Sequence, residues 1–325
     1  MSLTEGQSQD VSRLLRGDRR ALARLLTLLE RGGPDASALM RAIHPHTGRA
    51  YCVGVTGPPG AGKSTIVDGL TALWRADGLS VGILAVDPSS PFSGGALLGD
   101  RLRMQRHYLD SGVFIRSMSS RGEGGGLPLA VKGSVRLLDA SGVTMVAVET
   151  VGVGQAELRV MGVADTVVVA LTPEAGDAIQ SLKAGLTEAA DILVVNKADR
   201  EGASRLAEAL AASVQMGAPR DGWTPPILTT QAHTGAGLPE LRQAIERHRR
   251  WMESTSLLSS RRAARRREEA LELVERAVSE RVRGRIQADA ALQEALAAAE
   301  RGERDPYSCA EELLARLLPR WPEGR

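Results

Sequence analysis

Six short stretches of the chain are apolar almost without interruption, and stretches with helical spacing separate most of them. The six are YCVGVTG (51–57), VGILAVD (81–87), VFIRSM (113–118), VTMVAVE (143–149), TVVVAL (166–171) and ILVVN (192–196). Strands that are buried on both faces of a parallel sheet have this continuous pattern, whereas half-exposed strands alternate. Residues 49–250 are therefore predicted to form an α/β domain with a doubly wound, mainly parallel sheet.

The two ends of the chain have a different pattern, in which apolar residues recur every three or four positions. They are Leu22, Leu25, Leu26 and Leu29 near the start and Leu271, Val274, Val278 and Val282 near the end. We predict an N-terminal helical segment at 1–48 and a C-terminal helical arm at 251–325. The arginine-rich run 261–267 is interpreted as a solvated helix face, because glutamates follow it at once. Gly284 is expected to end that helix.

A glycine-rich loop, GPPGAGKST, follows the first apolar run and opens a helical pattern. It matches G-x-x-x-x-G-K-[ST] in the strand-to-helix context that this phosphate-binding motif requires. The glycines let backbone N–H groups converge on phosphate oxygens, the lysine reaches the β- and γ-phosphates, and the serine hydroxyl ligates Mg²⁺. A P-loop NTPase fold is therefore predicted. The expected nucleotide-binding residues here are Gly57, Pro58, Pro59, Gly60, Ala61, Gly62, Lys63, Ser64 and Thr65.

A second motif, NKAD, comes directly after the apolar run ILVV and indicates which base is bound. The carboxylate of Asp199 can accept hydrogen bonds from the N1–H and the exocyclic amine of guanine, a pattern that adenine does not offer. The loop TTQAHTGAG (229–237) is expected to close over the base, with the Ala232 N–H near the guanine oxygen. GTP or GDP is the predicted ligand. The expected base-binding residues are Asn196, Lys197, Asp199, Gln231, Ala232 and His233.

Three acidic residues are candidates for holding Mg²⁺ beside the phosphates. Glu149 and Asp87 each end an apolar run, and Asp100 lies in LLGDRLRM, where it could equally be a helix N-cap. Mg²⁺ takes few carboxylates and keeps several waters, so the division of labour among the three stays open. The backbone N–H of Gly152 can sense the γ-phosphate. From the motifs themselves, Lys63, Glu149 and Gly152 are the predicted catalytic residues and Ser64 and Glu149 the predicted Mg²⁺ ligands, while Asp87 and Asp100 remain candidates.

The composition mainly excludes other classes of protein. The formal net charge of +2 indicates neither nucleic-acid nor membrane binding. The two cysteines are far apart, which argues against a disulfide scaffold. No signal pattern opens the chain and no run of about 18 apolar residues occurs, so a cytoplasmic location is expected.

Two alternative functions remain open. A nickel-delivery GTPase would need metal ligands, but of the five histidines only His44 and His46 are close in sequence, and a surface loop explains these better. A nucleotide-stabilised interaction module would bind GTP with negligible hydrolysis, because no group that activates water is identified. Intrinsic hydrolysis is expected to be slow, about 10⁻³ to 10⁻¹ per second. Candidates for assisting it are Arg101, Arg116, Arg121 and Gln155.

The combination of motifs resembles the MeaB/ArgK family of P-loop GTPases, whose human member is the methylmalonic aciduria type A protein. The resemblance covers nearly the whole chain. The matching stretches are GVTGPPGAGKST, AVDPSSPFSGGALLGDRLRM, RSMSSRG, ETVGVGQAE, GDAIQSLKAG, VVNKADR and DPYSCAEELL.

The resemblance implies a GTPase chaperone of an adenosylcobalamin-dependent acyl-CoA mutase, above all methylmalonyl-CoA mutase. It also implies a homodimer built by the C-terminal helical arm. By matching motifs, Asp87, Asp100 and Glu149 take the Mg²⁺-site roles, and Asp100 is also counted as catalytic. Asp177 and Lys183 fall in a segment that contacts the nucleotide in the partner-bound state. The chain departs from the family pattern at Glu123, where a histidine is usual, which puts the contacts of that loop in doubt.

Overall fold

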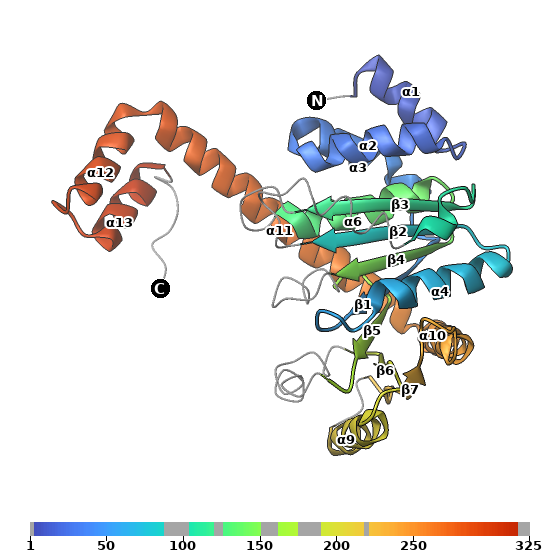
Figure 1. Ribbon diagram of the computed structural model, residues 1–325. Coiled ribbons are helices and arrows are strands. Elements are labelled where there is room, and N and C mark those ends of the chain that lie inside the picture. The colour runs from blue at the N-terminus through green and yellow to red at the C-terminus, as the bar shows by residue number, and fades with distance from the viewer. Residues whose placement is uncertain are drawn as a thin grey trace. The chain divides into compact units, whose positions relative to one another are not determined.

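A computed structural model of the chain describes residues 3–87, 104–119, 126–150, 162–174, 190–217 and 221–317. Two compact units are present, Met1–Arg262 and Ala263–Arg325. Figure 1 labels the helices and strands of both units.

The first unit is built on one seven-stranded parallel sheet with the order β3-β2-β4-β1-β5-β6-β7. The strands are β1 (Tyr51–Thr56), β2 (Val81–Asp87), β3 (Val113–Ser119), β4 (Met145–Thr150), β5 (Thr166–Leu171), β6 (Ile192–Asn196) and β7 (Ile227–Thr230). The predicted doubly wound sheet is confirmed, and each of the six apolar runs forms a strand. The edge strand β7 was not predicted.

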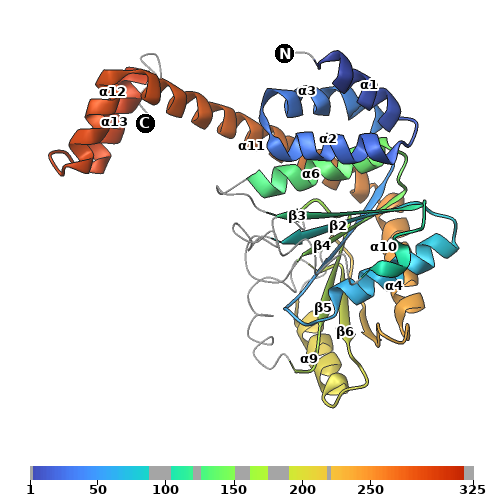
Figure 2. The same ribbon diagram turned by 45° about the horizontal axis from the view of Figure 1, so that its top comes forward.

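Helices cover both faces of this sheet (Figures 1 and 2). One face is covered by α2, α3, α6 and α9, and the other by α4 and α10. The bounds in this unit are α1 (Glu5–Leu14), α2 (Arg19–Arg31), α3 (Gly33–Ile43), η1 (His44–His46), α4 (Lys63–Ala76), η2 (Gln105–His107), α6 (Gly126–Ala140), α9 (Ala203–Met216) and α10 (Leu238–Ser254).

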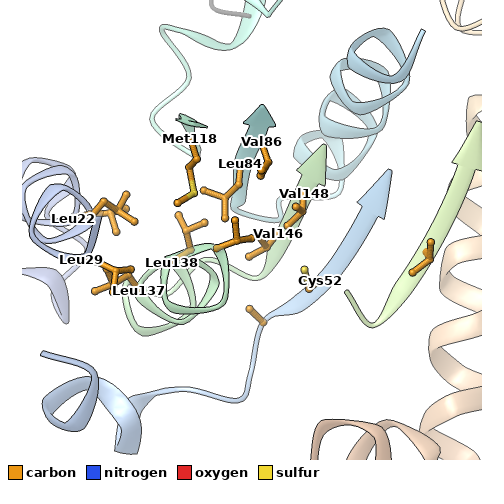
Figure 3. Packing of buried hydrophobic residues seen from close by; sticks show 14 of the residues in the cluster. Leu22, Leu29, Cys52, Leu84, Val86, Met118, Leu137, Leu138, Val146 and Val148 are labelled. Atoms are coloured by element: carbon orange, nitrogen blue, oxygen red, sulfur yellow. The ribbon is translucent and has the colours of Figure 1, made fainter. Parts of the chain in front are cut away.

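Alternation along the central strands divides the core into two apolar clusters. Val146 and Val148 of β4 face the first cluster, and Met145 and Ala147 face the second. Figure 3 shows the first cluster, where leucines of α2 and α6 pack beside the strands. Burying a side chain of this size stabilises the fold by about 1.5–3 kcal/mol. The predicted N-terminal helices thus share a core with the sheet.

The second unit is a small helical assembly. It contains most of α11 (Leu257–Ala288), together with α12 (Ala290–Glu300) and α13 (Pro306–Leu317). Its own core is Leu292, Ala295, Cys309 and Leu313. Gly284 does not end α11, contrary to expectation, and the break comes at Asp289. The Asp289 carboxylate accepts a hydrogen bond of 3.0 Å from the Ala291 N–H and caps the next helix.

No helix within the described ranges combines the length and the apolar character that crossing a membrane requires.

Candidate nucleotide site

The candidate site lies at the carboxyl edge of the sheet, where β1 runs into the loop Gly57–Gly62. At Gly57 the backbone φ is +140°, and a Cβ there would lie 1.9 Å from the carbonyl oxygen of Ala170 in β5. At Gly62 φ is +80°, and a Cβ would lie 2.3 Å from Nδ2 of Asn196. Both positions therefore require glycine for space as well as for conformation. The loop can approach its neighbours closely only because these two residues lack side chains.

Lys63 is the first residue of α4 and is buried. Its ammonium donates hydrogen bonds to the carbonyl oxygens of Gly57, at 2.7 Å, and Pro58, at 3.0 Å. The side chain therefore folds back across the loop instead of extending into solvent. A lysine ammonium beside a glycine-rich loop at the start of a helix is the arrangement that binds the β- and γ-phosphates of a nucleotide.

The next residue, Ser64, contacts one of the three predicted acids. Its hydroxyl donates a hydrogen bond of 2.5 Å to Oε1 of Glu149, and both side chains are buried. A hydroxyl and a carboxylate oxygen side by side are the hard oxygen ligands that Mg²⁺ prefers. These two residues therefore fit a magnesium ion. Asp87 is the last residue of β2 at the same edge, and its side chain lies outside the described part of the structure, as does Asp100.

The predicted base-recognition segment meets this loop through Asn196, the last residue of β6. Its Nδ2 donates a hydrogen bond of 2.8 Å to the Ala61 carbonyl oxygen. Its Oδ1 accepts from the Thr230 hydroxyl at 3.0 Å and from the Ala232 N–H at 3.1 Å. One buried amide thus joins the phosphate loop, the end of β7 and the loop 229–237.

The residues after Asn196 form a turn at the sheet edge. Lys197 has a φ of +56°, the left-handed conformation, which few residues other than glycine adopt. Asp199 is exposed at this edge, where its carboxylate can meet a base. In the loop 229–237, the Gln231 N–H donates to the Ala236 carbonyl oxygen at 2.9 Å, and His233 is exposed.

Several predicted residues lie outside the described part of the structure. They are Asp100, Gly152, Asp177 and Lys183, together with Arg101, Arg121, Glu123 and Gln155.

Arg116 is described, and it does not serve as a catalytic arginine in this structure. Its guanidinium binds both carboxylate oxygens of Glu30 in α2, at 3.0 and 2.7 Å. Arg116 therefore joins β3 to the N-terminal helices. Among the described residues, no group of three or more His, Cys, Asp or Glu side chains comes together as a metal cluster.

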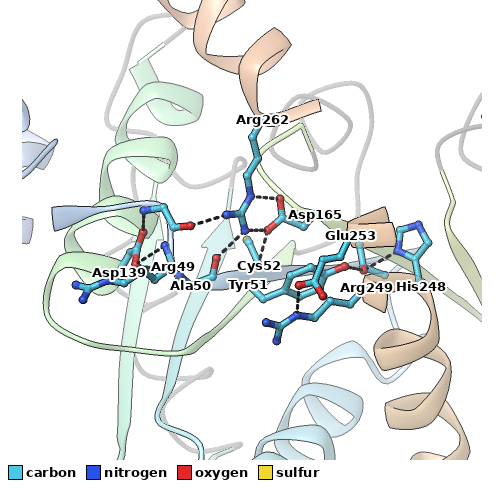
Figure 4. Close-up of polar contacts among 12 residues, drawn as sticks. Arg49, Ala50, Tyr51, Cys52, Asp139, Asp165, His248, Arg249, Glu253 and Arg262 are labelled. Atoms are coloured by element: carbon cyan, nitrogen blue, oxygen red, sulfur yellow. Dashed lines mark hydrogen bonds and ion pairs between the residues drawn. The ribbon is translucent and has the colours of Figure 1, made fainter. Parts of the chain in front are cut away.

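A polar cluster that the sequence interpretation missed lies at the opposite, amino edge of the sheet (Figure 4). Arg262 of α11 donates to the carbonyl oxygens of Gly48, at 2.8 Å, and Ala50, at 2.7 Å, and to the Asp165 carboxylate, at 2.6 Å. Burial alone would lower the pKa of the Arg262 guanidinium, but the hydrogen bond to Asp165 raises it on balance. The solvated-face interpretation is therefore wrong for the start of the arginine run.

The neighbouring Arg261 pairs with Asp221 at 2.9 Å and with the buried Asp191 at 3.4 Å. In the same cluster the Tyr51 hydroxyl bonds to Thr166 at 2.7 Å, and burial raises the pKa of that phenol. Thr166 also bonds to the buried His248 at 2.9 Å. This edge is held by structural polar contacts and not by a nucleotide.

Comparison with known proteins gives matches over most of the chain. A family model described as methylmalonyl-CoA mutase-associated GTPase MeaB matches residues 22–287. A putative GTPase of Pyrococcus horikoshii is 45% identical over 313 residues, which is 95% of this chain and 98% of that protein. The mitochondrial methylmalonic aciduria type A homolog of Mus musculus is 32% identical and covers 77% of this chain and 64% of its own length.

Among solved structures, one titled LAO/AO transport system kinase has a TM-score of 0.70 at 27% identity. The match covers 98% of this chain and 99% of that one.

Proposed function

The chain belongs to the MeaB family of methylmalonyl-CoA mutase-associated GTPases, and from this membership we propose that it is a GTP-hydrolysing chaperone of an adenosylcobalamin-dependent acyl-CoA mutase. Binding of guanine nucleotide and a P-loop GTPase activity come with the family. The finer role is to gate cofactor loading into the mutase and to protect it. Its main support is the family match over residues 22–287.

The described residues divide the work of binding GTP between them. Lys63, beside the loop amides, neutralises charge on the β- and γ-phosphates, and Asp199 selects guanine through its N1–H and amine. Ser64 and Glu149 would hold Mg²⁺. The ion, when bound, adds positive charge against the oxygens of the transferred phosphoryl group. Because phosphoryl transfer depends mainly on positioning and charge, this set can supply slow intrinsic hydrolysis without an identified base.

The switch that a partner would read lies in segments outside the described residues. There, Gly152 and Asp100 would respond to the γ-phosphate, and Asp177 and Lys183 would contact nucleotide in the mutase complex. Loss of the γ-phosphate would remove these contacts, as in other GTPases. The mutase would read the difference between GTP and GDP in this way.

We also propose that the protein is a homodimer that uses the C-terminal helical arm. Leu271, Val274 and Val278 lie on α11 at helical spacing and are 55%, 59% and 49% exposed. An apolar stripe left in water is characteristic of an interaction surface. A second copy of the chain would bury it.

The test is GTP turnover by the purified protein, alone and with the methylmalonyl-CoA mutase of the same organism. We expect a basal rate of about 10⁻³ to 10⁻¹ per second and a rise of at least about tenfold with the mutase. ATP serves as the control nucleotide, and Lys63→Ala as the control for contaminating hydrolases. A basal rate near 10 per second, or equal use of ATP, would contradict the proposal.

A GTP-bound protein whose turnover stays negligible with the mutase would favour the nucleotide-stabilised interaction module. A missing response combined with normal basal hydrolysis would exclude methylmalonyl-CoA mutase as the client.

A further inference from the structure

Two threonine hydroxyls meet where the neighbouring strands β1 and β4 end side by side. Thr56 is the last residue of β1 and Thr150 the last of β4. The Thr150 hydroxyl donates a hydrogen bond of 3.0 Å to the Thr56 hydroxyl. The two residues are 0% and 1% exposed. This contact lies one residue from Gly57 on one strand and next to Glu149 on the other.

The pair lies on the face of the sheet opposite to the Ser64–Glu149 contact. Side chains alternate along a strand, and Val148 faces the cluster that contains α6, so Thr150 faces that side as well. Glu149 faces the α4 side, where its carboxylate accepts the hydrogen bond from the Ser64 hydroxyl. The end of β4 is therefore held by two separate hydrogen bonds. Glu149 binds Ser64 on one face of the sheet, and Thr150 binds Thr56 on the other.

The two ties differ in what happens to them when Mg²⁺ binds. A serine hydroxyl that ligates Mg²⁺ offers an oxygen lone pair to the ion and can still donate its hydrogen, but Ser64 and Glu149 would both have to place an oxygen at the ion, so the geometry of their contact would change. Nothing in the Thr150–Thr56 contact needs to change, because it lies across the sheet from the ion. It can hold the end of β4 in register with β1 in both states.

The presence of threonine and not valine at positions 56 and 150 also indicates that the hydrogen bond between them matters. The strands around the pair are packed with apolar side chains such as Val55 and Val148, and valine has nearly the shape of threonine. Packing alone would be served by two valines, because replacing both partners of a buried hydrogen bond by apolar groups of the same shape is nearly neutral. Beyond packing, the hydroxyls add the directional bond between them.

We propose that Thr56 and Thr150 are positioning residues for GTP hydrolysis. Their hydrogen bond keeps the Glu149 carboxylate aligned with the phosphate loop while the contact between Ser64 and Glu149 adjusts to Mg²⁺. The inference rests on the magnesium role proposed above for Ser64 and Glu149, and not on the mutase role.

The decisive variant is the double substitution Thr56→Val with Thr150→Val, because it leaves no buried hydroxyl without a partner. We expect its thermal unfolding to stay close to that of the wild type. We expect its kcat for GTP to fall about tenfold, since small misplacements of catalytic groups cost this much or more. The KM for GTP should change little, and the Mg²⁺ concentration for half-maximal rate should rise. A folded double variant with wild-type kcat and Mg²⁺ dependence overturns the proposal.

Two further variants separate positioning from general packing. Thr150→Ser keeps the hydroxyl and should retain a rate within about threefold of the wild type. Thr71→Val removes another fully buried hydroxyl, one that donates to the Val67 carbonyl oxygen within its own helix, and should leave kcat unchanged. A rate loss in Thr150→Ser or Thr71→Val as large as in the double variant contradicts positioning.

Ser64→Ala distinguishes failure of this inference from failure of its premise. If Ser64→Ala leaves the Mg²⁺ dependence unaltered, the magnesium role proposed for Ser64 is wrong and the inference falls with it. If Ser64→Ala alters the Mg²⁺ dependence and the double valine variant does not, only the threonine pair is refuted.

Discussion

The side-chain amide of Asn196 donates a hydrogen bond of 2.8 Å to the Ala61 carbonyl oxygen, across a separation of 135 residues in sequence. This hydrogen bond within the chain itself fixes the base-recognition segment to the phosphate loop. Because the same amide accepts the Ala232 N–H, the loop that is expected to close over guanine is held by the same residue. The distance between base and phosphates is built into the fold.

Base selectivity should depend on the exposed carboxylate of Asp199. Asp199→Asn keeps one acceptor oxygen for the guanine N1–H but replaces the other by an N–H donor opposite the amine. We expect kcat/KM for GTP to fall at least about 100-fold, since sites built on such hydrogen bonds discriminate by up to about 10⁴. Xanthosine triphosphate, which offers a carbonyl in place of the amine, should become the better substrate. Arg200→Ala is the neighbouring control, and an unchanged preference for GTP in Asp199→Asn would contradict the assignment.

The close approach of Gly57 to β5 should be visible as a loss of stability. In Gly57→Ala the new Cβ would lie 1.9 Å from the Ala170 carbonyl oxygen, a backbone atom that cannot rotate away. We expect a loss of at least about 3 kcal/mol in the free energy of unfolding, measured with urea. Gly60→Ala is the matched control, because φ there is +77° with nothing within 4 Å of the Cβ. It should cost only about 1 kcal/mol of backbone strain. Equal losses in the two variants would contradict the steric argument.

The ion pair between Arg262 and Asp165 at the amino edge of the sheet should contribute strongly to stability. Arg262→Ala would leave the buried Asp165 carboxylate without its cation, and breaking a buried pair in this way costs about 3–5 kcal/mol. The control is Arg250→Ala, which breaks an exposed pair with Glu246 at 3.7 Å. Such pairs contribute at most about 0.5 kcal/mol. Thermal unfolding of both variants decides the matter, and a similar small shift in each would show that Asp165 tolerates the loss.

The N-terminal helices should lose stability in acid through Asp18. Hydrogen bonds from the Ala21 N–H and the Arg13 side chain lower the pKa of this carboxyl to about 2. Because its unfolded value is about 3.9, Asp18 stabilises the folded state fully above that pH, and the contribution disappears as pH falls towards 2. Asp18→Asn keeps an N-cap but cannot titrate, so its stability should fall less steeply over this window in urea unfolding. Glu5→Gln controls for the loss of a charge, and parallel curves for wild type and Asp18→Asn would refute the prediction.

The sequence pattern predicted most of the sheet because those strands are buried on both faces. β7 was missed for the corresponding reason: Ile227, Leu228 and Thr229 are only partly buried or exposed, so no apolar run marks this edge strand. Its end matters for the site, since Thr230 donates to Asn196. The motifs located the phosphate loop, but the pairing of Ser64 with Glu149 needed the strand order to become visible.

Polar contacts between distant segments were the least predictable part of the fold. Arg262 reads as surface in the sequence because its neighbours are charged, and its acceptors lie far away at Gly48 and Asp165. The threonine pair carries no motif, since each residue looks like the last member of an apolar run. Gly284 is a residue type that often ends helices, but α11 continues through it to Ala288. Local rules therefore place elements well and contacts poorly.

The central place of β1 in the sheet has a consequence for the order in which the protein is made. β1 carries the phosphate loop, and its partners β4 and β5 both come later in the chain. A ribosome therefore delivers the loop long before either neighbouring strand exists, and the Asn196 contact follows later still. Pairing strands that are distant in sequence costs loop-closure entropy before the new contacts compensate for it. β1 therefore cannot pair with β4 or β5 until these strands have been synthesised. The contact that fixes the base-recognition segment to the phosphate loop therefore cannot form until the chain has been synthesised past Asn196.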